Sequence, residues 1–258
     1  MNYLVNYSDE KFQAAQQYNT KTALSVGCFD HVFECNPKYI DAGFYKKNVS
    51  ILSQPRGGGY WLWKPYIIRR CLENINFGDI LIYSDSGAFF KKSARPLTQL
   101  PLKFQQDIIP FELEWPESSW TKRDAFILMD CDNQGFEQSR QRLASFIVVR
   151  KSLYSIDFIN QYINYCENEN ILTDVENISG VPNYDDFKDH RHDQSVFSLL
   201  SKKYGLSAFR DPSQWGNSRI QEYVNSDYEQ IIEHTRSKAP REARLLYRIK
   251  RKLFPRNT

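Results

Sequence analysis

The stretch Ile80-Leu-Ile-Tyr-Ser-Asp-Ser-Gly-Ala88 decides the fold class of this chain. Four residues, Ile80 to Tyr83, form an apolar run that leads into an aspartate held between two serines. A short apolar run that ends in turn residues is typical of a strand buried on both faces, as in parallel α/β sheets. Open α/β sheets bind ligands at the carboxyl ends of such strands. Asp85 is therefore expected at a ligand site, where its carboxylate could meet a nucleotide ribose or a metal-bound diphosphate.

Strand and helix patterns alternate around this stretch. The apolar runs and turn residues predict strands at 3–7, 22–27, 50–53, 125–129 and 144–150. The spacing of apolar residues predicts helices at 10–18, 65–74, 156–166 and 193–203. Alternation of this kind indicates βαβ units and a mainly parallel sheet. We expect a Rossmann-type α/β/α sandwich formed by residues 1–235, followed by a separate tail, 236–258.

Composition excludes several classes of protein. The chain has 258 residues with an ordinary apolar share of 41%, which argues against intrinsic disorder. Its five cysteines include no CxxC spacing, so reduced thiols in a cytoplasmic protein explain them best. No signal peptide opens the sequence, and no apolar run approaches the ~20 residues that span a bilayer. The expected location is the cytoplasm, with peripheral association at the inner face of the membrane.

The tail carries most of the positive charge. Residues 236–258 hold nine Lys or Arg and one Glu, a net charge of +8, which leaves −5 for the remainder of a chain whose total is +3. Wound as a helix, the tail places Leu245, Leu246, Ile249 and Leu253 near one another, with basic residues opposite. A basic amphipathic helix is typical of a segment that binds an anionic membrane surface. A helix packed on its own domain, or a disordered tail, remains an alternative, and nucleic acid is not an expected partner because the body is mildly acidic.

A second marker is Arg56-Gly-Gly-Gly-Tyr-Trp-Leu-Trp-Lys-Pro65. Glycines allow a backbone to approach a ligand closely, and Lys64 precedes a proline-started helix, where an anion such as a diphosphate is favoured. The alternative is a glycine loop whose tryptophans pack into the core. The two interpretations are about equally supported by this motif alone.

A third segment, His190-Arg-His-Asp-Gln-Ser195, opens the helix expected at 193–203. In isolation it is best explained as a charged helix cap. The density of ionisable groups is also typical of a site where pKa values are tuned. A histidine pair spaced i, i+2 with no nearby cysteine does not predict a structural zinc site.

Trp120-Thr-Lys-Arg-Asp124 is a weaker candidate. Lys122 and Arg123 could hold a phosphate, with Asp124 orienting them, although surface charge on a loop is the better explanation of this segment taken alone. The P-loop, dinucleotide, nucleophile-elbow and zincin motifs are all absent from the sequence.

These blocks, in this order, resemble bacterial GT-A-type glycosyltransferases of the capsule and lipopolysaccharide, or O-antigen, kind. The matching segments are 55–66, 78–87, 121–126 and 190–195. The resemblance implies a domain that binds a nucleotide-sugar, with a UDP-sugar as the expected donor, and transfers the sugar to a hydroxyl of a glycan or lipid-linked acceptor. It implies that Asp85 is the first residue of a DxD motif, which here reads Asp85-Ser86-Gly87 and lacks its second aspartate.

The missing aspartate bears on the cofactor. Mg²⁺ or Mn²⁺ requires oxygen ligands, and Asp85 supplies the one carboxylate of the motif, so the enzyme is either metal-dependent through Asp85 or metal-independent. In the second case, basic residues would neutralise the diphosphate. The expected catalytic residues are Asp193 as base, then His192 and His190. The expected donor-binding residues are Arg56, Gly58, Gly59, Trp61, Trp63, Lys64, Asp85, Ser86, Gly87, Lys122, Arg123, Asp124, Arg191 and Gln194.

Two other functions stay open. A sugar-phosphate nucleotidyltransferase would have a related sheet, but it would show a basic glycine-rich stretch after the first strand, which 3–9 lacks. A non-catalytic sugar- or protein-binding module is the third possibility, and the ionisable groups at 190–193 argue against it.

Overall fold

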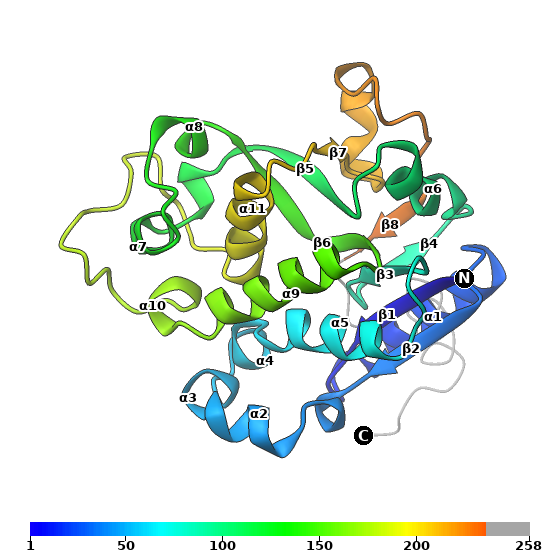
Figure 1. Ribbon diagram of the computed structural model, residues 1–258, viewed down its shortest axis with the longest axis horizontal. Coiled ribbons are helices and arrows are strands. Elements are labelled where there is room, and N and C mark those ends of the chain that lie inside the picture. The colour runs from blue at the N-terminus through cyan, green and yellow to red at the C-terminus, as the bar shows by residue number, and fades with distance from the viewer. Residues whose placement is uncertain (236–258) are drawn as a thin grey trace, which may run out of the picture.

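The computed structural model describes residues 1–235, and its centre is a six-stranded mixed sheet in the order β2-β1-β3-β6-β5-β7 (Figure 1). β1 pairs in parallel with β2 and with β3, and β5 pairs in parallel with β7. β6 is antiparallel to both of its neighbours, β3 and β5. Five strands therefore run in one direction and one is reversed. This agrees with the mainly parallel sheet predicted from the sequence. A second, small sheet pairs β4 with β8 in antiparallel fashion.

The strands are β1 (Asn2–Tyr7), β2 (His31–Cys35), β3 (Ile80–Ser84), β4 (Ala88–Phe90), β5 (Ile108–Pro116), β6 (Arg140–Arg150), β7 (Phe209–Arg210) and β8 (Ile232–His234). The helices are α1 (Gln13–Ser25), α2 (Ala42–Lys47), α3 (Val49–Leu52), α4 (Gly57–Tyr60), α5 (Trp63–Glu73), α6 (Arg95–Lys103), α7 (Arg123–Leu128), α8 (Gln134–Glu137), α9 (Leu153–Cys166), α10 (Glu169–Leu172) and α11 (Asp193–Lys203). Three 3₁₀ helices cover Pro37–Tyr39, Ser118–Trp120 and Gln214–Glu222.

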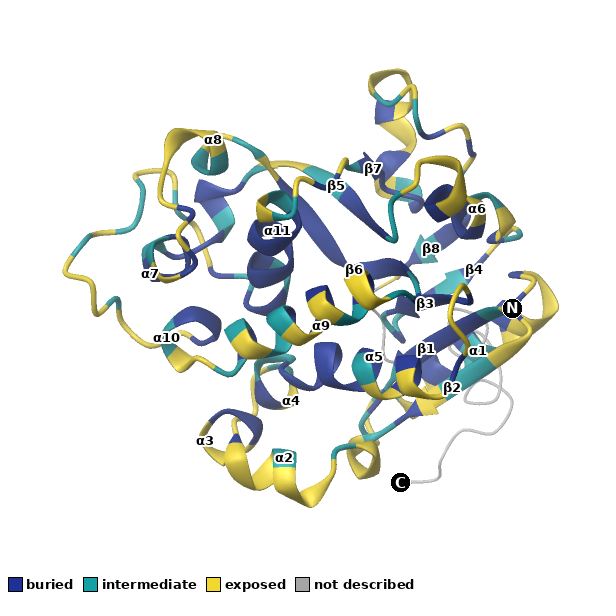
Figure 2. Ribbon diagram, viewed as in Figure 1, coloured by how far each residue is buried: buried dark blue, intermediate teal, exposed yellow. Residues whose placement is uncertain are grey.

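Alternate residues of the central strands enter two separate cores. Val5, Leu81 and Ile147 belong to a core shared with helices such as α5, α9 and α11. Their neighbours Leu4 and Ile82 belong to the opposite core, which contains residues of α1, α6 and the small sheet. A strand directs successive side chains to opposite faces, so an apolar run with no polar alternation requires a layer on each side. The α/β/α sandwich is confirmed, and the central strands are buried while the helices expose their outer faces (Figure 2).

Three expected strands are wrong, and one expected helix has different bounds. Residues 22–27, expected as a strand, end α1, and the strand nearest in sequence is β2. Residues 50–53 belong to helix α3 and the residue after it, and 125–129 lie in α7 and its end. Each is an apolar run of only four to six residues, a length at which strand and helix cannot be separated by periodicity. The helix expected at 10–18 begins later and runs longer, as α1.

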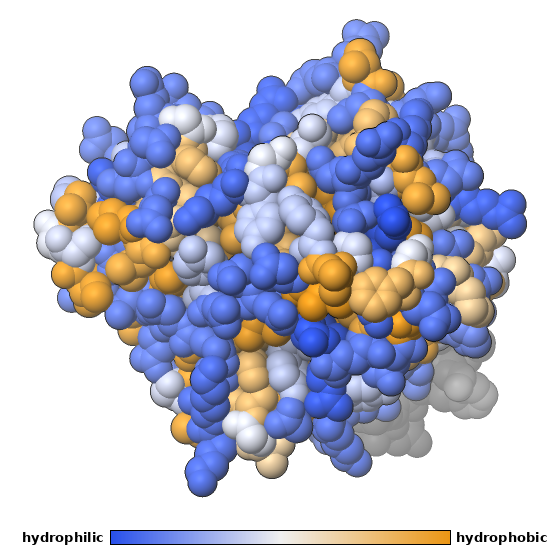
Figure 3. Space-filling model, in the orientation of Figure 1, coloured by the Kyte–Doolittle hydropathy of each residue, from blue (hydrophilic) through white to orange (hydrophobic). Residues whose placement is uncertain are grey.

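The outer surface is mostly hydrophilic on the face shown in Figure 3, where the hydrophobic area at the left lies over the segment between α10 and α11. Ile178 in this segment is 66% exposed. All five cysteines are unpaired, and four of them are buried, in agreement with reduced thiols. No helix within residues 1–235 combines the length and apolar character that crossing a membrane requires. The predicted basic amphipathic helix at 236–258 lies outside the described residues.

Candidate active site

A pocket of about 830 Å³ opens where β1 and β3 end. It is bordered by the residues after these strands, Ser8 and Asp85, and by the first residues of α5 and α11. The beginning of a helix carries a partial positive charge, so both helices favour an anionic ligand here. The pocket is lined by Tyr7, Ser8, Asp9, Lys11, Phe12, Pro55, Arg56, Gly57, Gly58, Trp61, Trp63, Lys64, Tyr83, Asp85, Ser86, Gly87, Trp120, Ser145, Asp189, His190, Arg191, His192, Asp193, Gln194 and His234.

Two carboxylates meet around one buried ammonium group in this pocket. The Nζ atom of Lys64 lies 2.6 Å from Oδ2 of Asp193 and 3.7 Å from Oδ1 of Asp85. The Lys64 side chain is 4% exposed and that of Asp193 5%, whereas Asp85 is 30% exposed and faces the pocket. Tyr83 donates a 2.7 Å hydrogen bond to Oδ1 of Asp85, and Tyr162 donates to Asp193. The structure therefore brings together the three sequence blocks that contain Lys64, Asp85 and Asp193.

Burial and pairing set the charges of this group. Burial raises the pKa of Asp193 to about 6, although Lys64 acts in the opposite direction. Burial alone would lower the pKa of Lys64, but the carboxylates of Asp193 and Asp85 more than offset it, so that the pKa is raised. A lysine that is buried and still protonated provides a fixed positive charge. The pKa of Asp193, by contrast, is raised toward neutral pH, the range that suits general acid–base catalysis.

The glycine loop forms a turn of left-handed helix. Five successive residues have positive φ: Gly57 (60°), Gly58 (59°), Gly59 (97°), Tyr60 (51°) and Trp61 (58°). For residues with a Cβ this conformation costs roughly 1–2 kcal/mol each, and strain of this kind concentrates at functional sites. A Cβ on Gly59 would lie 2.7 Å from the Cα of Leu52, whereas one on Gly58 would meet nothing closer than 3.8 Å.

The left-handed turn connects the two sides of the pocket. The Trp61 ring stacks on His192, with centroids 5.6 Å apart, and Tyr60 contacts the same imidazole edge-on. Trp63 donates from Nε1 to the carbonyl oxygen of Gly57 at 2.9 Å and stacks on Tyr7 with centroids 3.8 Å apart. The sequence alone left open whether these tryptophans face a ligand or the core. Both interpretations hold in part: the two tryptophans line the pocket, but Trp63 is also buried in the core and Trp61 packs against that core. Gly59 does not line the pocket.

One wall of the pocket was not predicted from sequence. This wall consists of the last residue of the first strand, Tyr7, and the residues Ser8, Asp9, Lys11 and Phe12 that follow it. Asp9 accepts hydrogen bonds from the backbone N–H groups of Lys11 and Phe12, which folds this loop back at the strand end. Ser86 donates to the carbonyl oxygen of Tyr7 at 2.6 Å and joins the ends of β3 and β1. The rule that ligands bind after parallel strands could have identified this wall, because β1 is itself such a strand.

The two histidines bind carbonyl groups at the end of α10. His190 contacts the carbonyl oxygen of Ile171 through Nε2 at 2.8 Å, and its Nδ1 accepts from the backbone N–H of Lys122. His192 contacts the carbonyl oxygen of Leu172 through Nδ1 at 2.9 Å. Burial lowers the pKa of each imidazole, that of His190 well below its ordinary value. Both rings line the pocket as neutral groups that hold α10 against the start of α11.

The remaining predicted ligands divide into two groups. Arg56 lies at the pocket and pairs with Asp174 at 3.0 Å and with Asp189 at 3.1 Å. Gly58, Gly87, Arg191 and Gln194 also line the pocket. Lys122, Arg123 and Asp124 do not.

The segment 122–124 instead fastens the residues between α10 and α11. Lys122 donates to the carbonyl oxygen of Val175, and Asp124 accepts from the backbone N–H groups of Ile178 and Ser179. Arg123 pairs with Asp132 and covers the ring of Tyr184. The phosphate-binding arrangement expected for this segment is therefore not what the structure shows. Its three charged side chains form hydrogen bonds or ion pairs with other residues of the protein.

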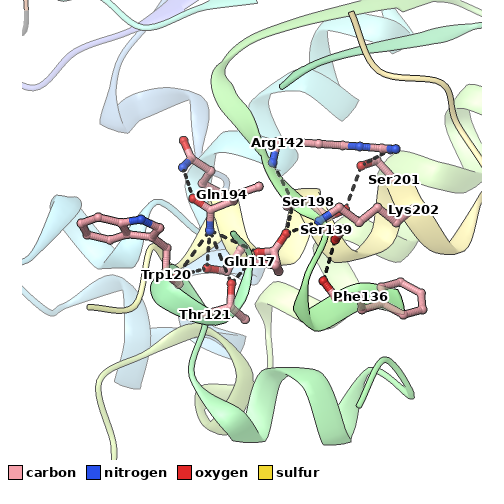
Figure 4. Close-up of polar contacts among 12 residues, drawn as sticks. Glu117, Trp120, Thr121, Phe136, Ser139, Arg142, Gln194, Ser198, Ser201 and Lys202 are labelled. Atoms are coloured by element: carbon pink, nitrogen blue, oxygen red, sulfur yellow. Dashed lines mark hydrogen bonds and ion pairs between the residues drawn. The ribbon is translucent and has the colours of Figure 1, made fainter. Parts of the chain in front are cut away.

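A buried polar network around Glu117 extends to the pocket residue Gln194 (Figure 4). Glu117 is fully buried and accepts hydrogen bonds from Thr121, Gln141, Ser198 and Lys202. Gln141 links this carboxylate to Gln194, which is a pocket residue. A buried carboxylate is tolerated when its oxygens are fully hydrogen-bonded and a positive charge is close, and both conditions hold here.

The residues at the pocket do not fit a divalent metal ion. Mg²⁺ and Mn²⁺ take several oxygen ligands, while the DxD position offers Asp85 alone. The ammonium group of Lys64 lies between Asp85 and Asp193, where a bridging cation would have to bind. Among residues 1–235 no group of three or more His, Cys, Asp or Glu side chains is arranged to hold a metal.

Comparisons with known proteins find structural likeness at low sequence identity. No protein-family model matches the sequence, and no curated protein sequence does. Mouse xyloside xylosyltransferase 1, in its apo form, aligns over 93% of this chain and 99% of its own, with 11% identity and a TM-score of 0.49. The galactosyltransferase LgtC, in complex with donor and acceptor sugar analogues, aligns over 91% and 87%, with 13% identity and a TM-score of 0.49. The Streptococcus pneumoniae glycosyltransferase GlyE aligns over 92% and 54%, with 15% identity and a TM-score of 0.45.

Proposed function

We propose that this chain is a glycosyltransferase that moves a sugar from a nucleotide-sugar, with a UDP-sugar as the expected donor, to a hydroxyl of a bacterial surface glycan. The observation that carries the proposal is the convergence of Asp85, Lys64 and Asp193 from three distant segments in one pocket. The sequence resemblance to GT-A-type glycosyltransferases rests on these same segments. A structural ion pair alone would not need a partly exposed carboxylate beside a large cavity at the strand ends.

The pocket has a suitable region for each part of the donor. The nucleoside lies along the residues after β1, where the stacked rings of Tyr7 and Trp63 form an aromatic wall. The diphosphate lies near Lys64 and Arg56, close to the first turns of α5 and α11. The sugar extends toward Asp193. This order is suggested by three observations: Tyr7 stacks on Trp63, Trp63 and Lys64 are successive residues of α5, and Lys64 pairs with Asp193.

The chemistry requires charge stabilisation at the leaving group. Transfer breaks the bond between the anomeric carbon and a diphosphate oxygen, and it forms a bond to the acceptor oxygen, whose proton must be taken up. Lys64 supplies a fixed positive charge as negative charge develops on the diphosphate. No step is assigned to a metal ion, because the donor set at Asp85 does not fit one.

Asp193 acts at the sugar end of the site. Its pKa of about 6 leaves it mainly ionised at neutral pH, and a carboxylate can take the acceptor proton in an inverting reaction. In a retaining reaction it would hold the donor sugar instead. The anomeric configuration of the product, determined by nuclear magnetic resonance, distinguishes these roles.

The acceptor proposal rests on the tail. A lipid-linked glycan, as in capsule or lipopolysaccharide synthesis, lies at a membrane surface, and the +8 charge of residues 236–258 favours anionic lipid. Flotation with liposomes that contain anionic lipid tests this directly. Full-length protein should float while the variant that ends at residue 235 should not, and equal partitioning of the two would remove the membrane from the proposal.

The function is tested by a donor panel. UDP-, GDP-, CMP- and TDP-sugars are each titrated into the full-length protein, and binding, donor hydrolysis and sugar transfer are followed. The proposal expects binding of one nucleotide class and slow release of its sugar to water or acceptor. Formation of a nucleotide-sugar from a sugar phosphate and a nucleoside triphosphate would identify a nucleotidyltransferase, and binding of free glycan without turnover would identify a binding module.

A further inference from the structure

The position of Gln194 in the pocket depends on a residue that does not line it. Gln194 donates from Nε2 to Oε1 of Gln141 at 2.8 Å, and its own Oε1 accepts from the backbone N–H of Ala144. Arg191, also at the pocket, donates to the same oxygen of Gln141 at 3.4 Å. Gln141 is fully buried on β6. One buried amide oxygen thus contacts two pocket side chains, Arg191 just before α11 and Gln194 in its first turn.

Glu117 fixes which end of the Gln141 amide faces the pocket residues. The Nε2 atom of Gln141 lies 3.2 Å from Oε1 of Glu117. A carboxylate paired with Lys202 can only accept hydrogen bonds, so the NH₂ group of Gln141 must point toward it. The carbonyl oxygen of Gln141 then points toward Gln194 and Arg191. If the amide were reversed, the oxygen of Gln141 would face the carboxylate of Glu117, and its NH₂ group would face the NH₂ group of Gln194.

The same carboxylate holds α11 at a second place. Ser198 and Lys202, one and two turns beyond the pocket, both donate to Oε2 of Glu117. Because α11 is a single rigid helix that begins at Asp193, these bonds set the rotation of the helix about its axis. The network therefore restrains Asp193 through the helix and Gln194 through Gln141.

We propose that Gln141 is a positioning residue for sugar transfer, a buried relay through which Glu117 fixes the Gln194 amide and the Arg191 guanidinium at the pocket. This inference rests on the proposed function. Gln141 makes no contact with substrate in this scheme. Its contribution is to remove the rotational freedom of Gln194, whose second N–H is then directed without a conformational search.

The test compares two substitutions that remove the same kind of bond to Glu117. Gln141→Met keeps the side-chain length and loses both the donor to Glu117 and the acceptor for Gln194. Ser198→Ala loses a donor to the same carboxylate but leaves in place both the Gln141–Gln194 bond and the Lys202–Glu117 pair, which still holds α11 and Asp193. We expect similar losses of thermal stability. We expect kcat to fall roughly 10- to 100-fold in Gln141→Met only, with the KM for the donor little changed.

Coupling to Gln194 separates a relay from general damage. If Gln141 acts through Gln194, the double variant Gln141→Met/Gln194→Ala should have nearly the kcat of Gln194→Ala alone. Additive losses, or equal kcat losses in Gln141→Met and Ser198→Ala, would overturn the proposal.

A measurement that does not depend on sugar transfer tests the relay independently of the proposed function. The side-chain amide resonances of Gln194 should move toward solvent-exposed positions and lose protection from exchange in Gln141→Met but not in Ser198→Ala. Unchanged resonances would overturn the relay even in an active enzyme. Altered resonances in a protein that transfers no sugar from any donor would support the relay and remove the proposed function.

Discussion

The ammonium nitrogen of Lys64 lies 2.6 Å from Oδ2 of Asp193, with both side chains almost completely buried. The pair joins the first turn of α5 to the first turn of α11, and Asp85 approaches the same nitrogen from the end of β3. A buried ion pair does not by itself stabilise a fold strongly, since desolvation opposes the attraction. Its place beside the pocket supports the proposed role of Lys64 at the diphosphate.

Replacing Lys64 with methionine should abolish transfer and destabilise the protein. The change leaves Asp193 buried without its cation, and breaking such a pair costs about 3–5 kcal/mol. Urea denaturation and a transfer assay measure the two effects. Lys151→Met is the matched control, because Lys151 is also buried and donates to the carbonyl oxygen of Ile75 away from the pocket. It should lose stability and keep activity; inactivation of both variants to the same degree would mean that Lys64 has no special role.

Removal of divalent metal should leave transfer within about twofold of its starting rate, because Lys64 occupies the place of a bridging cation. The measurement is sugar transfer after dialysis against EDTA, with Mn²⁺ and Mg²⁺ added back separately. Loss of activity that either ion restores would contradict the assignment of the diphosphate charge to Lys64.

Activity should depend on the ionisation of Asp193. Its pKa is raised by burial to about 6, and the carboxylate is the form that acts on the sugar or acceptor. The logarithm of kcat/KM for the donor should therefore rise with pH below about 6 and level off above it. A flat profile between pH 5 and pH 8 would exclude Asp193 as a titrating catalytic group.

The same group should make stability depend on pH. The folded state binds the Asp193 proton more tightly than the unfolded state, whose pKa is near 3.8. Between about pH 4 and pH 6 the folded state holds more protons, so the contribution of Asp193 to the free energy of unfolding falls as pH rises, by about 1.4 kcal/mol for each unit of pKa difference. Denaturation of wild type and Asp193→Asn over this range should show the difference, and parallel curves would contradict it.

The left-handed turn should respond unequally to two alanine substitutions. In Gly58→Ala the only cost is the strain of an alanine at positive φ, about 1–2 kcal/mol. Gly59→Ala has the same strain and also brings a Cβ to 2.7 Å from the Cα of Leu52. Gly59→Ala should therefore lower the free energy of unfolding clearly more than Gly58→Ala in urea titrations. Equal losses would mean that the backbone at Leu52 relaxes.

The sequence predicted the parts of this molecule that depend on local pattern. The strand before Asp85, the strand within 140–150 and the helix 193–203 follow directly from apolar runs and spacing. The segment 125–129 was misassigned because five apolar residues fit a short helix as well as a strand. Tertiary packing determines that this segment is a helix.

The site was only partly predictable for a similar reason. Residue types identify Lys64, Asp85 and Asp193 as candidates, but they identify Lys122 and Arg123 equally well. The sequence does not show that Lys122 binds the carbonyl oxygen of Val175 or that Arg123 pairs with Asp132. Gln141 and Glu117 are distant in sequence from the residues they restrain and belong to no motif. Contacts of this kind exist only once the strand β6 and the helix α11 have packed.

A crystal structure of the protein with an intact nucleotide-sugar, once the donor panel has identified it, tests the central claim most directly. The account predicts that the base lies beside Tyr7 and Trp63, the diphosphate within hydrogen-bonding distance of Lys64, and the sugar against Asp193. A donor bound elsewhere, or bound in this pocket with its diphosphate directed away from Lys64, would contradict it.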